Sequence, residues 1–285
     1  DYDEYGNAPD GFSMALMGGL LYYDQGRYVV GEEALPVSQA GQVTESGNLG
    51  QLNISYGANF DDKTYIGAGL GIQTLRFDRS SRYDETYPSS AQYLRSQYYD
   101  NELTITGTGL NLTVGVIQRL NDHLNLGASV TTPTLMWVTD SFIQYGGVDI
   151  LSPDAVLYDT EARTALDEFK YRIVSPLRAN ACISAFLPKK IGVVSLEAEY
   201  VGFSRMGIRD KNSEIWSDGQ NGIIQDEYKD VVNIKAGVEL RKGIGRLRGG
   251  FNFINDPLRY ATDYNVKKNT TIGSVGVGIR NSNFF

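Results

Sequence analysis

The sequence predicts an all-β protein and, within that class, a transmembrane antiparallel β-barrel. Apolar and polar residues alternate with a period of two, tight turns alternate with long polar segments, and no apolar run is long enough for a membrane-spanning helix. The longest nearly apolar run, 13–23, has about 11 residues, whereas a helical span needs about 20. A barrel strand presents only every second side chain to lipid, so the mean hydropathy of -0.28 is compatible with a membrane protein.

The first clear element is a hairpin between residues 52 and 72. Every second residue is apolar in the runs 52–60 and 66–72, and the residues between them are Asn, Ser or Gly. Asp61, Asp62 and Lys63 lie between the two runs as a tight turn. This pattern predicts two antiparallel strands that share one apolar face.

The same unit recurs along the chain. Further alternating runs lie at 110–116, 124–130, 177–185, 194–200, 232–240, 247–253 and 275–279. Tight turns are expected near residues 62, 122, 190 and 243, and long polar segments at 78–102, 139–168, 203–227 and 255–268. Short periplasmic turns on one side and long extracellular loops on the other are typical of a transmembrane barrel, of which about nine or ten strands are visible.

The opposite face of these strands is polar and charged. In a barrel this face lines the interior, and its expected lining residues are Arg172, Arg178, Glu197, Glu199, Lys235, Glu239, Arg246 and Arg248. Unpaired buried charge is costly, so we expect Glu197 and Glu199 to pair with arginines across a narrow lumen. This indicates a plugged or tightly filled barrel more than an open pore.

The first 45 residues differ from the rest, and we expect two parts: a loop or cap segment at 1–45, and the barrel strands at 46–285, a fragment of the full barrel. Asp10 is placed to cap a short helix from Gly11 to Tyr23, whose apolar residues have no period of two. A distorted strand is the alternative for this segment.

Composition excludes several classes of function. The net charge of -8 argues against a nucleic-acid partner, because phosphate binding needs clustered Lys and Arg. The chain has one cysteine, Cys182, and one histidine, His123, so it has no intrachain disulfide and a zinc site is not expected. We expect no metal, no cofactor and no enzymatic activity.

Several stretches carry a resemblance. They are 53–59 with 65–69, 126–134, 175–178, 195–200 and 233–241. In order and spacing they resemble the FadL/TodX family of outer-membrane transport proteins, and the resemblance covers most of residues 43 to 280. It implies a barrel of fourteen strands with an N-terminal hatch inside, and diffusion of long-chain fatty acids or aromatic hydrocarbons. No hatch signature is present and fewer strands are visible, so we expect that this chain lacks the hatch and the last strand or two.

Two candidate sites for a hydrophobic ligand follow. A cleft is expected between the apolar loop 142–157 and the helix at 11–23, formed by Leu16, Leu20, Tyr23, Phe142, Ile143, Tyr145, Ile150 and Leu151. Packing of loop on loop is the alternative. A tyrosine cluster at 83–99 is interpreted as a ligand rim or as a membrane-interface belt.

Two prolines, Pro133 and Pro176, interrupt strands. Proline donates no N–H to a β-ladder, so each marks either an opening in the wall through which an apolar ligand leaves sideways, or a bulge outside the bilayer.

These features predict passive transport of hydrophobic small molecules across the outer membrane of a Gram-negative cell, with outer-membrane lipid around the barrel. The alternative is a barrel subunit that transports nothing and docks a partner protein in a secretion or surface complex.

Overall fold

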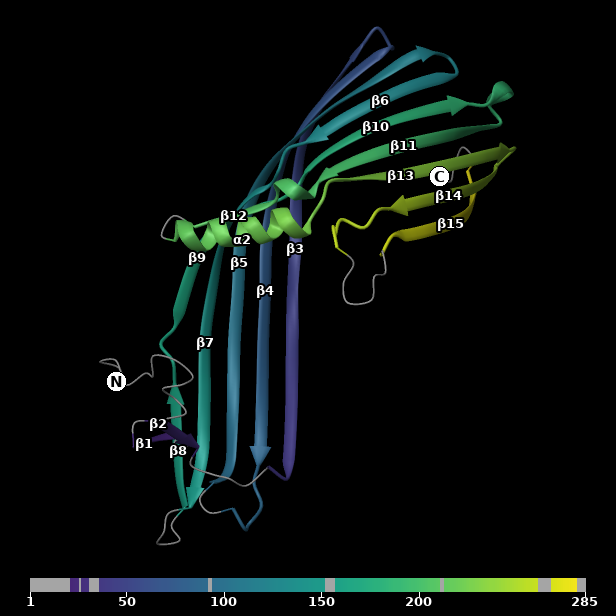
Figure 1. Ribbon diagram of the computed structural model, residues 1–285. Helices are drawn as coiled ribbons and strands as arrows, with labels where there is room; N and C mark the ends of the chain where they lie inside the picture. The colour runs from purple at the N-terminus through teal and green to yellow at the C-terminus, as the bar shows by residue number, and fades with distance from the viewer. Residues whose placement is uncertain are drawn as a thin grey trace. The chain divides into compact units, whose positions relative to one another are not determined.

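The computed structural model describes residues 21–25, 27–30, 36–91, 94–151, 157–210, 213–260 and 268–280. It confirms an all-β, antiparallel fold, and it has one short α-helix among these described residues (Figure 1). The chain divides into two compact units. Unit 1 comprises 1–50, 74–107 and 138–170, and unit 2 comprises 51–73, 108–137 and 171–285. Among the described residues, no helix is long and apolar enough to cross a bilayer.

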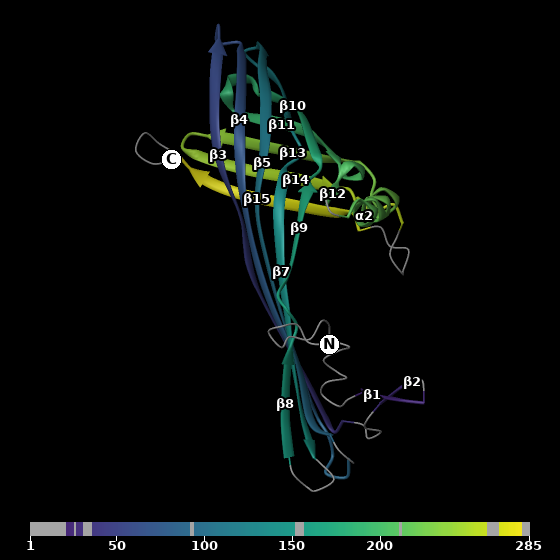
Figure 2. The ribbon, with the colours of Figure 1, turned by 90° about the vertical axis from the view of Figure 1, so that its left-hand side faces the viewer.

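Nine neighbouring antiparallel strands contribute to unit 2 among the described residues, in the order β3, β4, β5, β6, β10, β11, β13, β14, β15, and the first three of them also extend into unit 1. Figures 1 and 2 both show β10, β11, β13, β14 and β15 side by side. Their bounds are Ser38–Phe60 (β3), Thr64–Thr86 (β4), Leu94–Asn121 (β5), Leu124–Thr131 (β6), Leu177–Phe186 (β10), Gly192–Gly202 (β11), Val231–Lys242 (β13), Gly245–Ile254 (β14) and Thr270–Ile279 (β15). The alternating runs of the sequence all lie in these strands. Within the described residues β3 pairs only with β4, and β15 only with β14.

The tight turns lie where the sequence predicts them, all at one end of the unit 2 strands. Asp61 and Asp62 adopt φ angles of 52° and 53°, the left-handed conformation that a two-residue hairpin turn requires and that Asp tolerates. Gly243 does the same at φ 58° in the β13–β14 turn. Backbone bonds link each turn to the next strand: Arg119 to Lys63, Phe186 to His123, Arg241 to Ile191 and Arg280 to Ile244, at 2.7–2.8 Å.

The long polar segments are largely not loops, which corrects the prediction. The segment 78–102 continues strands β4 and β5, and 139–168 contains most of β7 (Leu135–Leu151), β8 (Leu157–Arg163) and the start of β9 (Asp167–Val174). Unit 1 is built from these extensions, with neighbours β3, β4, β5, β7 and β8. Polar side chains occupy both faces there. The apolar alternation therefore ends although the hydrogen-bonded ladder continues.

A buried carboxylate ties unit 1 together. Glu85 is 9% exposed and accepts hydrogen bonds from Gln39 and Tyr83 at 2.7 Å, from Tyr87 at 2.9 Å, and from Gln97. Burial raises the pKa of Glu85, but these four bonds outweigh burial and hold it below its usual value. The four donors are neutral, and they connect β3, β4 and β5 around one charge.

The segment 203–227 contains a short 3-10 turn (η2, Phe203–Arg205), a strand (β12, Gly207–Arg209) and an α-helix (α2, Glu214–Glu227). Asn221 fastens the helix to β12: its Oδ1 accepts the Ile208 N–H at 2.7 Å, and its Nδ2 donates to the Ile208 carbonyl at 2.8 Å. Trp216 meets Tyr171 edge-on at 6.3 Å. A second short turn, η1 (Pro188–Lys190), joins β10 to β11.

The helix expected at 11–23 is wrong for residues 21–23, the part of it that the structure describes. Leu21–Asp24 (β1) pairs with Arg27–Val30 (β2) in an antiparallel hairpin, so the last residues of the expected helix are a strand. Asp10 and the helix residues up to 20 lie outside the described residues. Strand β3 begins at Ser38, before the boundary expected at 46.

Candidate functional site: the two faces of the unit 2 sheet

One face of the unit 2 sheet exposes large apolar side chains on strand after strand. Register fixes this face: Leu196 lies between Ile183 of β10 and Ala236 of β13. Its exposed members include Leu52, Ile54, Tyr56, Ile66, Leu112, Val114, Leu126, Val130, Val194, Leu196, Val232, Val238, Leu240, Leu247, Phe251, Val275, Val277 and Ile279. Valines 275 and 277 are each 85% exposed. A contiguous apolar surface of this extent needs an apolar surrounding.

The apolar face has the height of a membrane barrel. In β13 it runs from Val232 to Leu240, which at a rise of about 3.3 Å per residue spans about 26 Å along the strand. With the tilt of about 40° usual in barrels, this gives about 20 Å along the membrane normal, close to the apolar band of roughly 25 Å in outer-membrane barrels.

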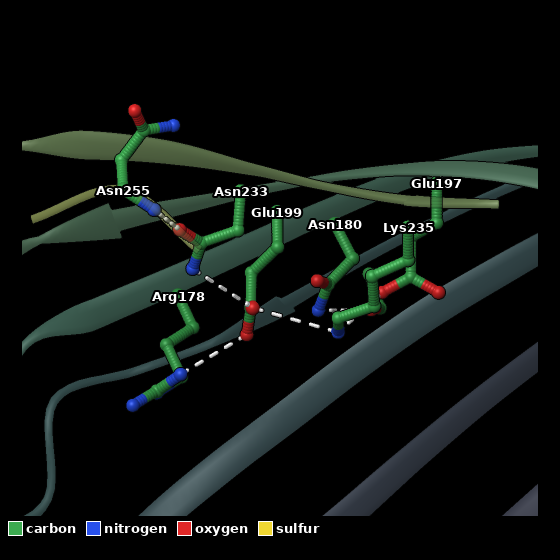
Figure 3. A network of polar contacts seen from close by, with 8 residues as sticks. Arg178, Asn180, Glu197, Glu199, Asn233, Lys235 and Asn255 are labelled. Atoms are coloured by element: carbon green, nitrogen blue, oxygen red, sulfur yellow. Dashed lines mark hydrogen bonds and ion pairs between the residues drawn. The ribbon is translucent and has the colours of Figure 1, made fainter. Parts of the chain in front are cut away.

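The opposite face carries a network of charged and amide side chains on β10, β11 and β13 (Figure 3). Glu199 is its centre: Oε1 accepts a bond from Arg178 Nη1 at 3.0 Å, and Oε2 faces Lys235 Nζ at 3.4 Å and Asn233 Nδ2 at 3.3 Å. Lys235 also pairs with Glu197 at 3.1 Å. The two carboxylates are thus matched by two cations.

Glu199 pairs with Arg178 as expected, whereas Glu197 pairs with Lys235 and not with an arginine. Each carboxylate pairs with a residue of a neighbouring strand, and Arg248 pairs with Glu239 at 2.7 Å. Antiparallel register explains this, because Glu197 lies opposite Lys235 and Glu239 lies opposite Arg248. The charges are neutralised within the sheet, so no group beyond the sheet is needed to pair them.

The remaining expected lining residues fall in two places. Arg246 lies beside Glu239, with Nε 3.8 Å from Oε1. Arg172 is in β9, opposite Arg209 of β12, and is not part of the network. Its Nε is buried without a hydrogen-bond partner in the part of the chain that the structure describes.

A hollow of about 970 Å³ lies against the polar face of β3, β4, β5 and β6, and reaches Asn180, Cys182 and Glu197. Glycines make the room, since Gly57, Gly67, Gly69, Gly115 and Gly127 all line it. A Cβ at Gly127 would lie 2.6 Å from the Cys182 sulfur. This hollow was not predicted from the sequence, although glycine at alternate positions of the polar face indicates space beside a strand.

The part of the expected hydrophobic cleft that was assigned to a loop lies in a strand. Phe142, Ile143, Tyr145, Ile150 and Leu151 lie in strand β7, not in a loop. Successive residues of a strand point to opposite faces, so adjacent members of this set do not line one surface. Tyr23 is in β1, and Leu16 and Leu20 lie outside the described residues.

The tyrosine cluster is divided among separate contacts. Tyr83 and Tyr87 donate to Glu85, and Tyr98 lies under the Arg82 guanidinium at 4.4 Å while its hydroxyl donates to Glu161 at 3.0 Å. These contacts hold unit 1 together and leave the ligand-rim interpretation without support from Tyr83, Tyr87 or Tyr98.

The two prolines mark neighbouring strand breaks. Pro133 separates β6 from β7, and Pro176 separates β9 from β10. Hydrogen bonds bridge the breaks, from Ser175 N–H to the Thr134 carbonyl at 3.1 Å and from Thr134 N–H to Ser175 Oγ at 2.8 Å. The side-chain oxygen of Ser175 thus acts as a ladder acceptor where the regular pairing stops.

No family model matches the chain, and no curated protein matches it. Among solved structures, the crystal structure of the Pseudomonas putida toluene transporter TodX is similar, with 11% identity over 86% of this chain and 80% of that chain and a TM-score of 0.36. This likeness is too distant to carry an argument about function, which must come from the residues themselves.

Proposed function

We propose that this chain forms part of the wall of an outer-membrane β-barrel that passes hydrophobic small molecules by diffusion. The observation that carries the proposal is the division of the unit 2 sheet into an exposed apolar face and a polar face with internally paired charges. A barrel wall needs both faces at once, because lipid contacts one and the interior contacts the other.

Passage of hydrophobic molecules is supported by the hollow. Gly57, Gly115 and Gly127 contribute no side chain that fills it, and its volume of about 970 Å³ lies in the range of small-molecule sites. Long-chain fatty acids and aromatic hydrocarbons are the proposed substrates. The breaks at Pro133 and Pro176 are the proposed places where such a molecule leaves sideways through the wall.

The test is uptake by vesicles that contain the full-length protein. We expect faster entry of a fluorescent fatty acid or of toluene than into vesicles with an unrelated barrel. A Gly115→Leu, Gly127→Leu variant fills the hollow and should slow entry at least fivefold, whereas a Gly219→Leu variant, whose Cβ meets nothing within 4 Å, should leave it unchanged. Equal uptake by wild type and the unrelated barrel contradicts the proposal.

The second candidate, a barrel subunit that docks a partner protein, is favoured by one feature. Helix α2 exposes Ile215 (91%) and Ile223 (51%). Purification in mild detergent with a stoichiometric partner, lost in an Ile215→Ser, Ile223→Ser variant, would favour docking over transport.

A further inference from the structure

Charge is not balanced along the polar face of the unit 2 sheet. The network around Glu199 matches two cations with two carboxylates, whereas three arginines, Arg241, Arg246 and Arg248, surround the single carboxylate of Glu239. In the described part of the chain, no second acidic side chain pairs with these arginines. The group therefore carries a surplus of two positive charges, beside the tight turn between β13 and β14.

Register makes this surplus costly. Arg241 and Arg246 are direct cross-strand partners, and like charges placed opposite each other destabilise a sheet. Arg246 is held in place by two bonds from Nη1 to the Gly243 and Gly245 carbonyls, at 3.1 and 3.2 Å. A bound anion would relieve the repulsion between the opposed guanidinium groups.

Glu239 orients two of the arginines for such a ligand. Its Oε1 accepts Nε of Arg241 at 2.8 Å and its Oε2 accepts Nε of Arg248 at 2.7 Å. Both bonds use Nε. The Nη groups of both arginines form no hydrogen bond within the described residues. The side chains are 40% and 62% exposed, which leaves these donors accessible.

We propose that Arg241, Arg246 and Arg248, organised by Glu239, bind a phosphate group. Guanidinium groups present paired N–H donors that match the oxygens of phosphate. A phosphate monoester carries about -1.5 to -2 charges at pH 7, which matches the surplus, and the phosphodiester of a lipid headgroup carries one negative charge, which offsets half of it. The phosphate belongs either to a soluble molecule or to a lipid headgroup. The site is independent of the proposed transport and does not use the hollow.

The test is calorimetric titration of the folded full-length protein, in a neutral detergent at low salt, with inorganic phosphate. We expect saturable binding that weakens at least tenfold in an Arg241→Gln, Arg248→Gln variant. An Arg248→Lys variant keeps the charge but loses the planar fork, and should lie between the two. Arg119→Gln is the matched control, because Arg119 is also beside a tight turn, on β5, and should bind phosphate like the wild type.

Two further measurements separate the outcomes. Native mass spectrometry after exposure to phosphatidylglycerol shows whether the headgroup of a lipid occupies the site, through a loss of bound lipid in the same double variant. Circular dichroism of each variant checks that it is folded. The proposal is overturned if the wild type binds neither phosphate nor phosphatidylglycerol, or if the folded double variant binds them as tightly as the wild type.

Discussion

Replacing Leu196 by arginine tests whether the apolar face of unit 2 contacts lipid. Leu196 is 50% exposed and lies in the middle of that face, between Val194 and Ala198 on the same strand. If lipid covers it, an arginine near the bilayer midplane costs about 2–4 kcal/mol of folding free energy. If water covers it, the same change at an exposed position stays within about 0.5 kcal/mol.

The assay is urea unfolding of the protein folded into lipid vesicles, followed by tryptophan fluorescence. Ser195→Arg is the matched control, because Ser195 is the neighbouring residue on the polar face, where the long side chain reaches water and Glu197. We expect Leu196→Arg to lose about 2–4 kcal/mol and Ser195→Arg less than half of that. Equal stability of Leu196→Arg and wild type would refute a lipid-facing assignment for this face.

Three further predictions concern single contacts. Ser175→Ala removes the acceptor of the Thr134 N–H, and should cost about 1–3 kcal/mol by urea unfolding, with Ser204→Ala, whose amide bond to Asp230 persists, costing less. Glu85→Gln places an amide among four donors and should destabilise unit 1 by about 1–3 kcal/mol, whereas Asp84→Asn, on the exposed Arg82 pair, should change little. Backbone N–H groups of Lys268 and Leu258 donate to Asp256 and lower its pKa. The stabilisation that the ionised carboxylate gives is therefore present above its unfolded pKa of about 3.9 and is lost as pH falls through the lower folded value. The protection factor of the Leu258 amide, its intrinsic exchange rate divided by the observed rate at the same pH, should fall there, and a constant protection factor would contradict this.

The sequence predicts the unit 2 strands well because one apolar and one polar face impose a strict period of two. The run 52–60 becomes part of β3, and the turns at 61–63 and 243 appear as expected. Where both faces are polar the period disappears, so the segment 78–102 reads as a loop although the ladders of β4 and β5 continue through most of it. Helix α2 was missed for a related reason, because Gly219, Gly222 and its acidic residues read as a polar loop.

The polar face was predicted by residue, but of its ion pairs only Arg178–Glu199 was predicted by partner. Sequence indicates that Glu197, Glu199 and Arg178 share a face, but only register shows that Lys235 lies opposite Glu197. The surplus of arginines around Glu239 depends on the same register. Arg248 follows Glu239 by 9 residues in the sequence, yet it lies opposite Glu239 in the sheet. Side-chain alternation fixes the face of a residue, whereas the turn lengths and pairing fix its neighbour.

The row of tight turns has a consequence for how the chain folds. Hairpins β5–β6, β10–β11 and β13–β14 each close through a few residues, and such hairpins form in about 1–10 μs. Pairing β6 with β10 instead brings Thr131 to Arg178 across the whole segment 132–177. Loop closure of that length makes this non-local pairing the slow step, so the folding rate of unit 2 is set by a connection outside its hairpins.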